Sequence, residues 1–393
     1  MIILDKMLTG MPTPARSRVE ATLDNVSMML QLKNPKVASS MAPSAVRGLV
    51  MQQGKRRDHV HMQANHKVDF DFTYKLDFPE MNALYRRAVA NQWDGDKDLD
   101  WSTDVDPMNP EIPVINADFV PMDRLREYGV KLNEKEAAQA NYNMVCWMLS
   151  QFMHGEQGAL YASAQVTESV KWMDGKFYGA TQVMDEGRHL EVFLRYLDSK
   201  LQKSYRINDN LFVIIDDLMT DSRWDIKFLG MQIMVEGLAL GAFTTLHNNS
   251  QEPLLRKLLQ YVIQDEARHV HYGVLALRDH FREALSDAER KEREDWAFEV
   301  AVLMRNRFMG HEVYEEMFEG SMTRRQWNEF ITGSPAMARF RHQMFKRLIP
   351  NLKHIGLLST RMQHHYEQAG LWEFSSGKNA CELTEQDMLA DLH

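Results

Sequence analysis

The chain has 393 residues, a formal net charge of −9, 44% hydrophobic residues and 26% charged residues. These proportions are typical of a globular protein with a sizeable core, arranged as one large domain or two ordinary ones. The acidic balance gives no reason to expect nucleic acid or an anionic membrane as a partner.

The cysteine content and the N-terminus favour a cytoplasmic protein without a membrane span. Two cysteines, Cys146 and Cys381, are too few for a disulfide framework. Cys146 lies in the apolar run 144–149, where a small core residue is favoured over a redox group. Asp5 and Lys6 interrupt the only short apolar start, which argues against a signal peptide. No window approaches about 18–20 uninterrupted apolar residues.

We expect residues 1–124 to form an irregular, loop-rich N-terminal extension that packs on the core. Residues 54–67 are basic and rich in histidine. A solvated arm that wraps the core or a neighbouring subunit is the favoured interpretation of this stretch, and a patch for an acidic partner is the alternative. One short helix is predicted over 79–92, and an acidic, turn-rich linker with Trp93 and Trp101 follows it.

From about residue 132 the sequence predicts one helix after another, with almost no strand signal. Asn133 fits a helix N-cap because Glu136 follows three residues later, close to a capping box. We predict a single all-α domain over 125–375 and a polar, mobile tail over 376–393. The predicted helices are the one that follows Asn133 and passes through residue 156, then 177–197, 209–218, 224–246, 253–277, 287–310, 312–318, 324–332, 335–350 and 352–368.

The motif Asp-Glu-x-Arg-His occurs twice, at 185–189 and at 265–269. The two copies are 80 residues apart, and the same offset relates Glu156 to Glu236. Positions i and i+3 of a helix project from one face, so each Glu-x-x-His unit can aim a carboxylate and an imidazole at one point. About 30 residues separate each unpaired Glu from the next motif, which suits two antiparallel helices and a short turn. The pattern therefore predicts a two-metal site inside a four-helix bundle.

Six side chains form the candidate ligand set and together offer four carboxylates and two imidazoles. They are Glu156, Glu186, His189, Glu236, Glu266 and His269. This set suits two ions of borderline hardness, such as iron or manganese. Calcium and magnesium do not favour two imidazoles, and a single zinc ion would leave carboxylates unused. The alternative is a pair of surface helices with salt-bridged Glu, Arg and His, which six such groups on apolar helix faces disfavour.

The neighbours of the motif histidines also suggest a role. A metal-bound histidine normally donates its other ring N–H to a carboxylate or carbonyl, and Asp185 and Asp265 are available for this. Arg188 and Arg268 would pair with those carboxylates and fix them. Exposed Asp–Arg pairs are the alternative for these four residues.

Over about residues 130–280 the chain resembles the ferritin-like di-iron carboxylate superfamily. This superfamily includes multicomponent monooxygenase hydroxylases, ribonucleotide reductase small subunits and the oxidases that resemble them, acyl carrier protein desaturases and arylamine N-oxygenases. The resemblance implies a ferritin-like four-helix bundle with additional helices, in which the six residues above are the ligands. It also implies crossed hydrogen bonds, between Asp185 and His269 and between Asp265 and His189.

Four positions depart from individual families. Ribonucleotide reductase small subunits usually have Asp as the first ligand and a radical-forming Tyr four residues after the first motif histidine, where this chain has Glu156 and Phe193. The N-oxygenases carry an extra His ligand where this chain has Val262. The hydroxylases carry a polar residue where it has Leu240. The resemblance therefore reaches the superfamily and leaves the subfamily open.

The predicted function is that of an O2-activating di-iron oxygenase that hydroxylates a small organic substrate. Two Fe ions are expected, with a Mn/Fe pair as the alternative, and Glu236 or Glu266 is expected to shift and open a coordination position. A separate reductase or ferredoxin must supply electrons, because the chain has no flavin, nicotinamide or Cys-cluster motif. A homodimer is expected because it is common for the resembled architecture. The alternatives are an amine N-oxygenase, an oxidase or radical generator, an iron-handling protein and a structural bundle.

Small residues stand next to the candidate ligands. They are Gly158, Ala159, Ala162, Gly237, Ala239 and Gly241. Close helix packing and a substrate pocket beside the metals explain them equally well.

Overall fold

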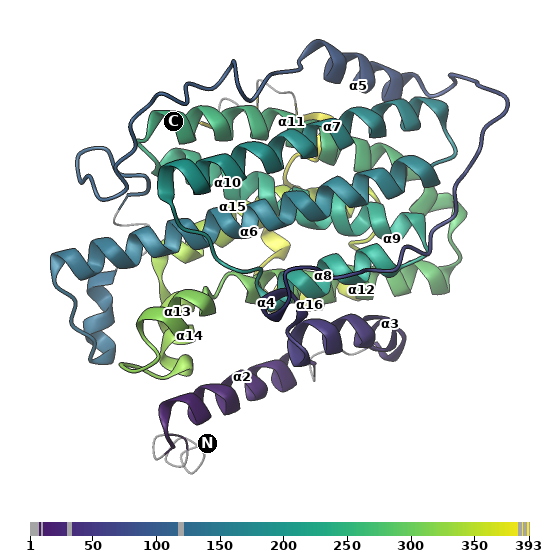
Figure 1. The fold of residues 1–393 in the computed structure, drawn as a ribbon. Helices are drawn as coiled ribbons and strands as arrows, with labels where there is room; N and C mark the ends of the chain where they lie inside the picture. The colour runs from purple at the N-terminus through teal and green to yellow at the C-terminus, as the bar shows by residue number, and fades with distance from the viewer. Residues whose placement is uncertain are drawn as a thin grey trace.

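The computed structural model describes residues 8, 11–29, 34–116, 122–383, 387 and 391–392. In these residues every regular element is a helix and no strand is present, which confirms the all-α prediction. Figure 1 shows long helices stacked side by side, with the N-terminal helices α2 (Thr13–Met29) and α3 (Pro35–Ala45) along one side of the stack.

Four helical stretches carry the six candidate ligands and pack together (Figure 1). They are α6 (Glu134–Ser169), α7 (Met173–Tyr196), the continuous run of α9 (Trp224–Phe228), η5 (Leu229–Val235) and α10 (Glu236–Asn249), and α11 (Pro253–Asp279). Only residues 170–172 connect α6 to α7, and only residues 250–252 connect α10 to α11. Connections this short make each pair antiparallel, so the stretches form two helical hairpins that pack on each other.

The starts of these helices follow from their local sequences. Asn133 caps α6 and forms the predicted capping box with Glu136. Pro253 is the first residue of α11, where its missing N–H costs nothing. The Glu252 side chain accepts hydrogen bonds from the N–H groups of Leu254 and Leu255, so the first turn of α11 is also capped.

Further helices complete the core and match most of the predicted ones to within a few residues. They are α8 (Asp209–Thr220), α12 (Asp287–Arg307), α13 (His311–Met317), α14 (Arg324–Gly333), α15 (Pro335–His354) and α16 (Thr360–Gln368). Among them, α15 packs closely on α10 and α8 packs on α6 and α12. The hairpins are therefore enclosed by helices that carry none of the candidate ligands.

The prediction that a helix ends at residue 350 is wrong, because α15 continues through Pro350 to His354. Ile349 and Leu352 on either side are fully buried, and this packing outweighs the local preference of proline to end a helix. The helix ends where Gly356 adopts a left-handed backbone with φ of +89°. The stretch 352–368 is therefore not one helix.

The N-terminal extension is more helical than predicted. Besides the expected short helix, seen as α5 (Pro79–Ala90), it contains α2, α3 and the single turn α4 (Gln53–Arg56). Val37 and Met41 of α3 are buried, and α3 packs on α8. Tertiary packing rather than a strong local pattern therefore stabilises this helix, which explains why the sequence did not reveal it.

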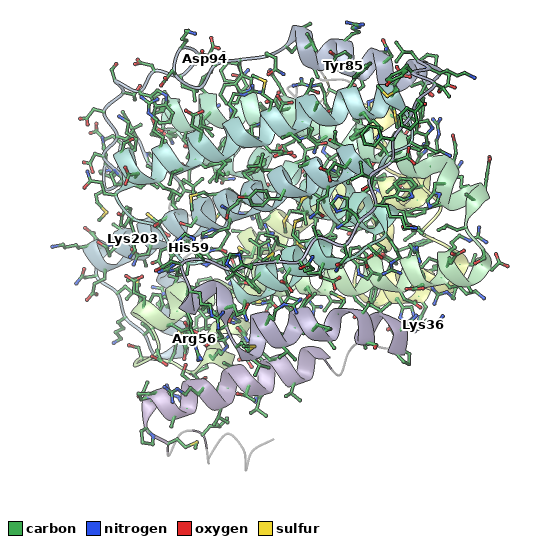
Figure 2. All side chains as sticks on the ribbon, turned by 45° about the vertical axis from the view of Figure 1, so that its right-hand side comes forward. Lys36, Arg56, His59, Tyr85, Asp94 and Lys203 are labelled. Atoms are coloured by element: carbon green, nitrogen blue, oxygen red, sulfur yellow. The ribbon has the colours of Figure 1, made fainter. Side chains whose placement is uncertain are left out.

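The basic stretch 54–67 contacts the core and is also exposed, as expected of a solvated arm that wraps the core. The Lys55 ammonium lies 3.3 Å from Asp209 Oδ2 and 3.0 Å from Glu312 Oε1, so the start of the stretch is tied to the core. Arg56 and His59 are exposed at the surface, as Figure 2 shows.

The prediction of a mobile tail over 376–393 is wrong for residues 379–383. The Ala380 N–H donates to Asn351 Oδ1 of α15 at 2.8 Å, and Ala380 is buried. Asn379 and Glu382 cap the short turn η8 (Ala380–Glu382), which packs on α11. Residues 384–386, 388–390 and 393 lie outside the described part of the chain.

The stretch Trp224–Asn249 is long and apolar enough to cross a membrane by length and composition. In the folded chain 94% of the apolar 18-residue segment within this stretch is buried inside the protein. It occupies the place of a core helix, in contact with α11 and α15. An apolar helix needs such an environment on all sides.

Two of the small residues beside the ligands serve close helix packing. A Cβ on Gly158 would lie 2.8 Å from Ile215 Cδ1 of α8, and one on Gly241 would lie 2.5 Å from the Gln343 backbone oxygen of α15. Gly237 is different, because its nearest neighbour would be Leu348 Cδ1 at 3.8 Å. Close packing is therefore the explanation for Gly158 and Gly241.

We expect Gly241→Ala to lower the free energy of unfolding by about 1–3 kcal/mol, because the added methyl group must displace the α15 backbone. Gly155→Ala is the matched control, since a Cβ there meets nothing within 4 Å. Alanine at that helical position should raise stability by about 0.5–1 kcal/mol. Urea unfolding followed by circular dichroism measures both variants, and equal stabilities would contradict the close α10–α15 contact.

Candidate metal centre

The structure brings all six candidate ligands together in the interior. Each helical stretch contributes to the set: Glu156 from α6, Glu186 and His189 from α7, Glu236 from the first residue of α10, and Glu266 and His269 from α11. None of the six is more than 5% exposed. The interpretation as surface salt bridges is therefore wrong, because these side chains are removed from solvent.

Both imidazoles turn the same ring nitrogen towards the carboxylates. His189 Nδ1 lies 3.4 Å from Glu156 Oε2, 3.5 Å from Glu186 Oε2 and 3.3 Å from Glu266 Oε1. His269 Nδ1 lies 3.0 Å from Glu186 Oε1 and 3.5 Å from Glu266 Oε1. Carboxylates at 186 and 266 thus face both imidazoles, which is the arrangement of a centre with two adjacent cation positions.

These side chains could hold metal ions in two overlapping groups. The ligand atoms of each group lie within 4.8 Å of one another, and the groups are Glu156, Glu186, His189 and Glu266, and then Glu186, Glu236 and His269. Glu186 belongs to both groups, so its carboxylate can bridge them. The donors are hard oxygens and borderline nitrogens, a combination that suits a transition-metal ion.

Buried atoms without partners support the fit of a cation. Within the described part of the chain, six atoms of the candidate ligands are buried and have no hydrogen-bond partner. They are His189 Nδ1, His269 Nδ1, Glu186 Oε2, Glu236 Oε2, Glu266 Oε1 and Glu266 Oε2. Buried polar atoms normally have partners, and a group of acceptors that converge without donors is the environment that a metal ion satisfies.

The predicted crossed hydrogen bonds are present. His189 Nε2 lies 3.0 Å from Asp265 Oδ2, and His269 Nε2 lies 3.3 Å from Asp185 Oδ2. Each bond joins the two hairpins, because each histidine and its aspartate come from different motifs. A carboxylate on Nε2 favours the tautomer that carries the proton there, which leaves the Nδ1 lone pair free to bind a metal.

The motif arginines complete a buried charge network. Arg188 Nη2 donates to Asp185 Oδ1 at 2.5 Å and to Asp265 Oδ2 at 3.0 Å, and Arg268 Nη2 donates to Asp265 Oδ1. All four residues are at most 7% exposed, so the alternative of exposed Asp–Arg pairs is wrong. Two aspartates and two arginines balance in charge, which buried ions require.

Two further residues of this network lie where the sequence predicts the end of the helix 79–92 and the start of the linker. Trp93 Nε1 donates to Asp265 Oδ2 at 2.7 Å, and the Arg188 guanidinium lies over the Trp93 ring at 4.6 Å. Gln92 Nε2 donates to Asp185 Oδ1 at 3.1 Å, and Gln92 Oε1 accepts from Arg188 Nη1 at 2.8 Å. The segment after α5 thus closes the outer side of the network. The pairing of Trp93 with acidic residues was the only sequence signal, and it does not specify these partners.

Gln182 is the residue closest to the ligands that the sequence did not reveal. Its Nε2 donates to Glu186 Oε1 at 3.1 Å and to Glu236 Oε1 at 3.0 Å. Its position one helical turn before Glu186 places it on the ligand face of α7, which is the signal that was available. The amide therefore holds two carboxylates from different hairpins in one orientation.

Glu236 follows a local change in helix geometry. The seven residues before it form the π-helical segment η5, where an ordinary helix was predicted. A π-helical turn is wider than an α-helical one and is often found at functional sites because it redirects a side chain. Here the π-helical segment sets the direction in which the Glu236 side chain projects from the helix.

The pKa values of the buried carboxyl groups are shifted in two opposite directions. Burial raises the pKa of Glu156 and of Glu236 well above the usual 4.5, and neighbouring carboxylates reinforce this effect. Burial also acts on Glu186, but His269 and His189 outweigh it and lower the Glu186 pKa. The pKa values of His189 and His269 are raised, because the surrounding carboxylates outweigh their burial. Without metal, the centre therefore retains protons that a cation would displace.

Comparisons with known proteins add no assignment to this geometry. No family model matches the chain. No curated protein matches it either.

We expect the metal-free protein to lose stability as the pH rises from about 5 to about 8. The raised pKa values of Glu156 and Glu236 stabilise the fold fully below the unfolded value of 4.5, and this stabilisation is lost as the pH rises above it. The raised values of His189 and His269 act in the same direction above 6.5. The lowered pKa of Glu186 acts in the opposite direction, but only below 4.5.

Urea unfolding with a chelator present should show a fall of at least about 1 kcal/mol over this range. The variant Glu156→Gln/Glu236→Gln should flatten the profile, because its amides do not titrate. Iron-loaded protein should gain stability relative to the metal-free form as the pH rises. A metal-free profile that rises with pH would contradict the assignment of these protons.

Proposed function

We propose that the six buried ligands hold two iron ions, or one manganese and one iron, and that the protein is an O2-activating oxygenase of a small organic substrate. The observation that carries the proposal is the pair of overlapping ligand groups that share Glu186. Four carboxylates balance the charge of two divalent cations, and two imidazoles favour iron or manganese over calcium or magnesium. The arrangement of the four helical stretches fits the ferritin-like bundle that the sequence resembles.

A reduced di-iron pair, when bound, supplies electrons to O2 and thus the oxidising power of the reaction. The protein residues prepare the place where this occurs. Asp265 and Asp185 hold His189 and His269 with Nδ1 towards the metals. Gln182 holds one oxygen of Glu186 and one of Glu236, which limits how far these carboxylates can turn.

The flank of the centre is apolar. Leu240 and Val262 lie one helical turn from Glu236 and Glu266, and Phe193 lies one turn from His189. All three are buried. Apolar walls at these positions exclude water and would hold the apolar part of a substrate, which protects a strong oxidant from wasteful reactions. Hydroxylation of an aliphatic or aromatic C–H bond fits such walls better than binding of a charged substrate.

Electrons must come from a separate reductase or ferredoxin in this proposal. The chain has only two cysteines, and neither belongs to a cluster-binding pattern. Cys146 is buried and its pKa is raised to about 12 by that burial, so it is not a thiolate near neutral pH.

The test is anaerobic loading with Fe(II), followed by metal analysis and measurement of O2 uptake in the presence of a reductant. We expect about two iron ions per chain. His189→Ala and His269→Ala should each reduce this number to about one or fewer, because each removes a ligand of one ion. His271→Ala is the matched control, since His271 lies on the same helix but in neither ligand group. A wild-type content well below two ions, or an equal loss in the control, would overturn the proposal. A stable organic radical after O2 exposure would instead favour the radical-generating alternative.

We further expect Gln182→Leu to weaken binding of the second ion by about 10- to 100-fold, the usual effect of losing a residue that orients a ligand. Leucine keeps the size of the side chain and removes the donor to Glu186 and Glu236. The control is Gln139→Leu, because Gln139 of α6 donates to Asn143, which is not a candidate ligand. Titration with Co(II), followed by its visible absorption, gives both affinities. Unchanged binding in Gln182→Leu would show that the amide does not position these carboxylates.

A further inference from the structure

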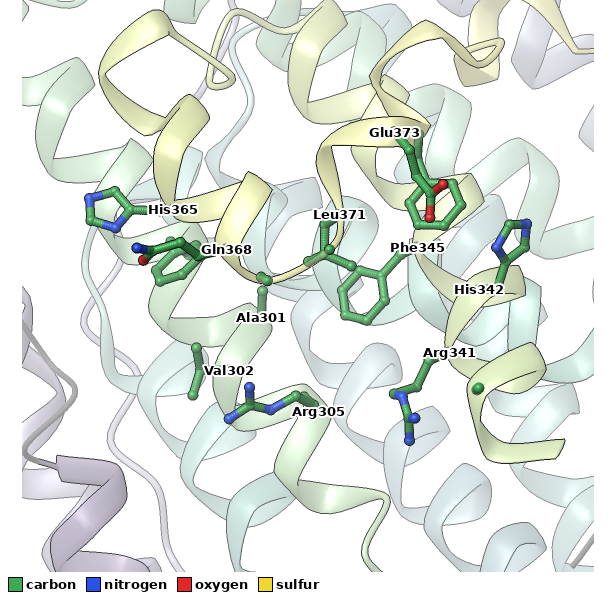
Figure 3. A pocket seen from close by; sticks show the side chains of 15 residues that line it. Ala301, Val302, Arg305, Arg341, His342, Phe345, His365, Gln368, Leu371 and Glu373 are labelled. Carbon is green, nitrogen blue, oxygen red and sulfur yellow. The ribbon is translucent and has the colours of Figure 1, made fainter. Parts of the chain in front are cut away.

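A pocket of about 600 Å³ lies between α12, α15, α16 and the segment that follows α16. Figure 3 shows this pocket from close by. It contains none of the candidate metal ligands and none of the residues that orient them. Its volume is within the range of pockets that bind small organic molecules, about 300–1,000 Å³.

Two arginines from different helices line this pocket. Arg305 comes from α12 and Arg341 from α15. In Figure 3 their guanidinium groups lie on one side of the pocket, and the single carboxylate of the lining, Glu373, lies on the opposite side. Burial lowers the pKa of Arg341, and the nearby charge of Arg305 lowers it further, so the two cations influence each other.

Neither arginine is neutralised by a carboxylate in the described residues. Arg305 donates to the Asn306 side chain at 3.3 Å, and Arg341 donates to the Thr332 backbone oxygen at 3.0 Å. Their neighbours behave differently: Arg293 on α12 pairs with Asp225, and the α16 residue Arg361 pairs with Glu294. Arg305 is exposed and Arg341 is half-buried, so the pocket carries two cations without acidic partners among the described residues, in a chain with a net charge of −9.

The rest of the pocket is largely apolar. Phe345 and Phe374 are buried, and Phe298 and Leu371 also contribute to the wall. A ligand that matches this lining has an anionic group that binds the arginines and an apolar body that packs against the apolar wall. The planar guanidinium is suited to carboxylates, sulfonates and phosphates, to which it donates two parallel hydrogen bonds.

We propose that this pocket binds a small amphipathic anion, with its charged group on Arg305 and Arg341 and its apolar body against Phe345 and Leu371. The site is separate from the metal centre, and its binding does not depend on the proposed oxygenase activity. The charged group can be a carboxylate or a phosphate, since both present oxygens to the same donors.

The direct test uses the fluorescent probe 8-anilinonaphthalene-1-sulfonate and its neutral analogue N-phenyl-1-naphthylamine, which lacks the sulfonate. We expect the wild-type protein to bind the sulfonate at least about tenfold more tightly than the neutral compound. Arg305→Gln/Arg341→Gln should abolish this preference and retain binding of the neutral compound. Ala338→Trp should reduce binding of both compounds, because Ala338 is an exposed residue of the lining that the indole would fill.

The control is Arg206→Gln/Arg290→Gln, which removes the same charge from surface arginines that do not line the pocket. It should keep the preference for the sulfonate, and circular dichroism should show all variants folded. Competition against the bound sulfonate by decanoate and by decyl phosphate then identifies the charged group, and displacement by either one supports the site. The proposal is overturned by equal binding of the two probes to wild type, by an unchanged preference in Arg305→Gln/Arg341→Gln, or by displacement with neither competitor.

Discussion

Four carboxyl groups within a few ångströms of one another, enclosed by helices, are the constraint on which the rest of this structure depends. Two carboxylates 4 Å apart repel by about 4 kcal/mol at the effective dielectric constant of a protein. Removing each of them from water adds several kcal/mol. Such a group persists only if protons or cations neutralise it. Without metal, the imidazoles and the protonated carboxyl groups serve this neutralisation, whereas the Asp–Arg network is balanced within itself.

The approximate twofold symmetry of the centre is a consequence of the same constraint. Each hairpin contributes one single glutamate and one Glu-x-x-His unit, so each brings two carboxylates and one imidazole. The repeat is not complete, however. The π-helical segment η5 precedes Glu236, whereas Glu156 lies within a regular α-helix. Gln182 bonds to Glu236 and has no counterpart that bonds to Glu156 among the described hydrogen bonds. The two groups of candidate ligands are therefore chemically different, although their residue types are similar.

The sequence predicted the centre better than it predicted the surroundings. Spacing along helices and a repeated offset suffice to predict that these six side chains converge, because both are properties of the local chain. The partners Gln92 and Trp93 could not be identified, since their contacts with Asp185 and Asp265 depend on how the segment after α5 crosses α7 and α11. Helix α3 and the buried turn at Ala380 were missed for a similar reason: packing against α8 and α15 stabilises them, and short segments carry little signal of this. Pro350 shows the opposite error, where a local rule was overruled by burial.

The crossed pairing of the histidines with the aspartates also affects the lifetime of any bound ion. His189 is held by Asp265, and His269 is held by Asp185, so each hairpin orients a ligand of the other. Fraying of one hairpin would therefore disturb both cation positions at once, and neither could open while the other stays formed. Exchange of metal with the surroundings would then require the two hairpins to separate, an event close in free energy to global unfolding. Uptake and release of metal by the folded protein would therefore be slow, on the time scale of such an opening.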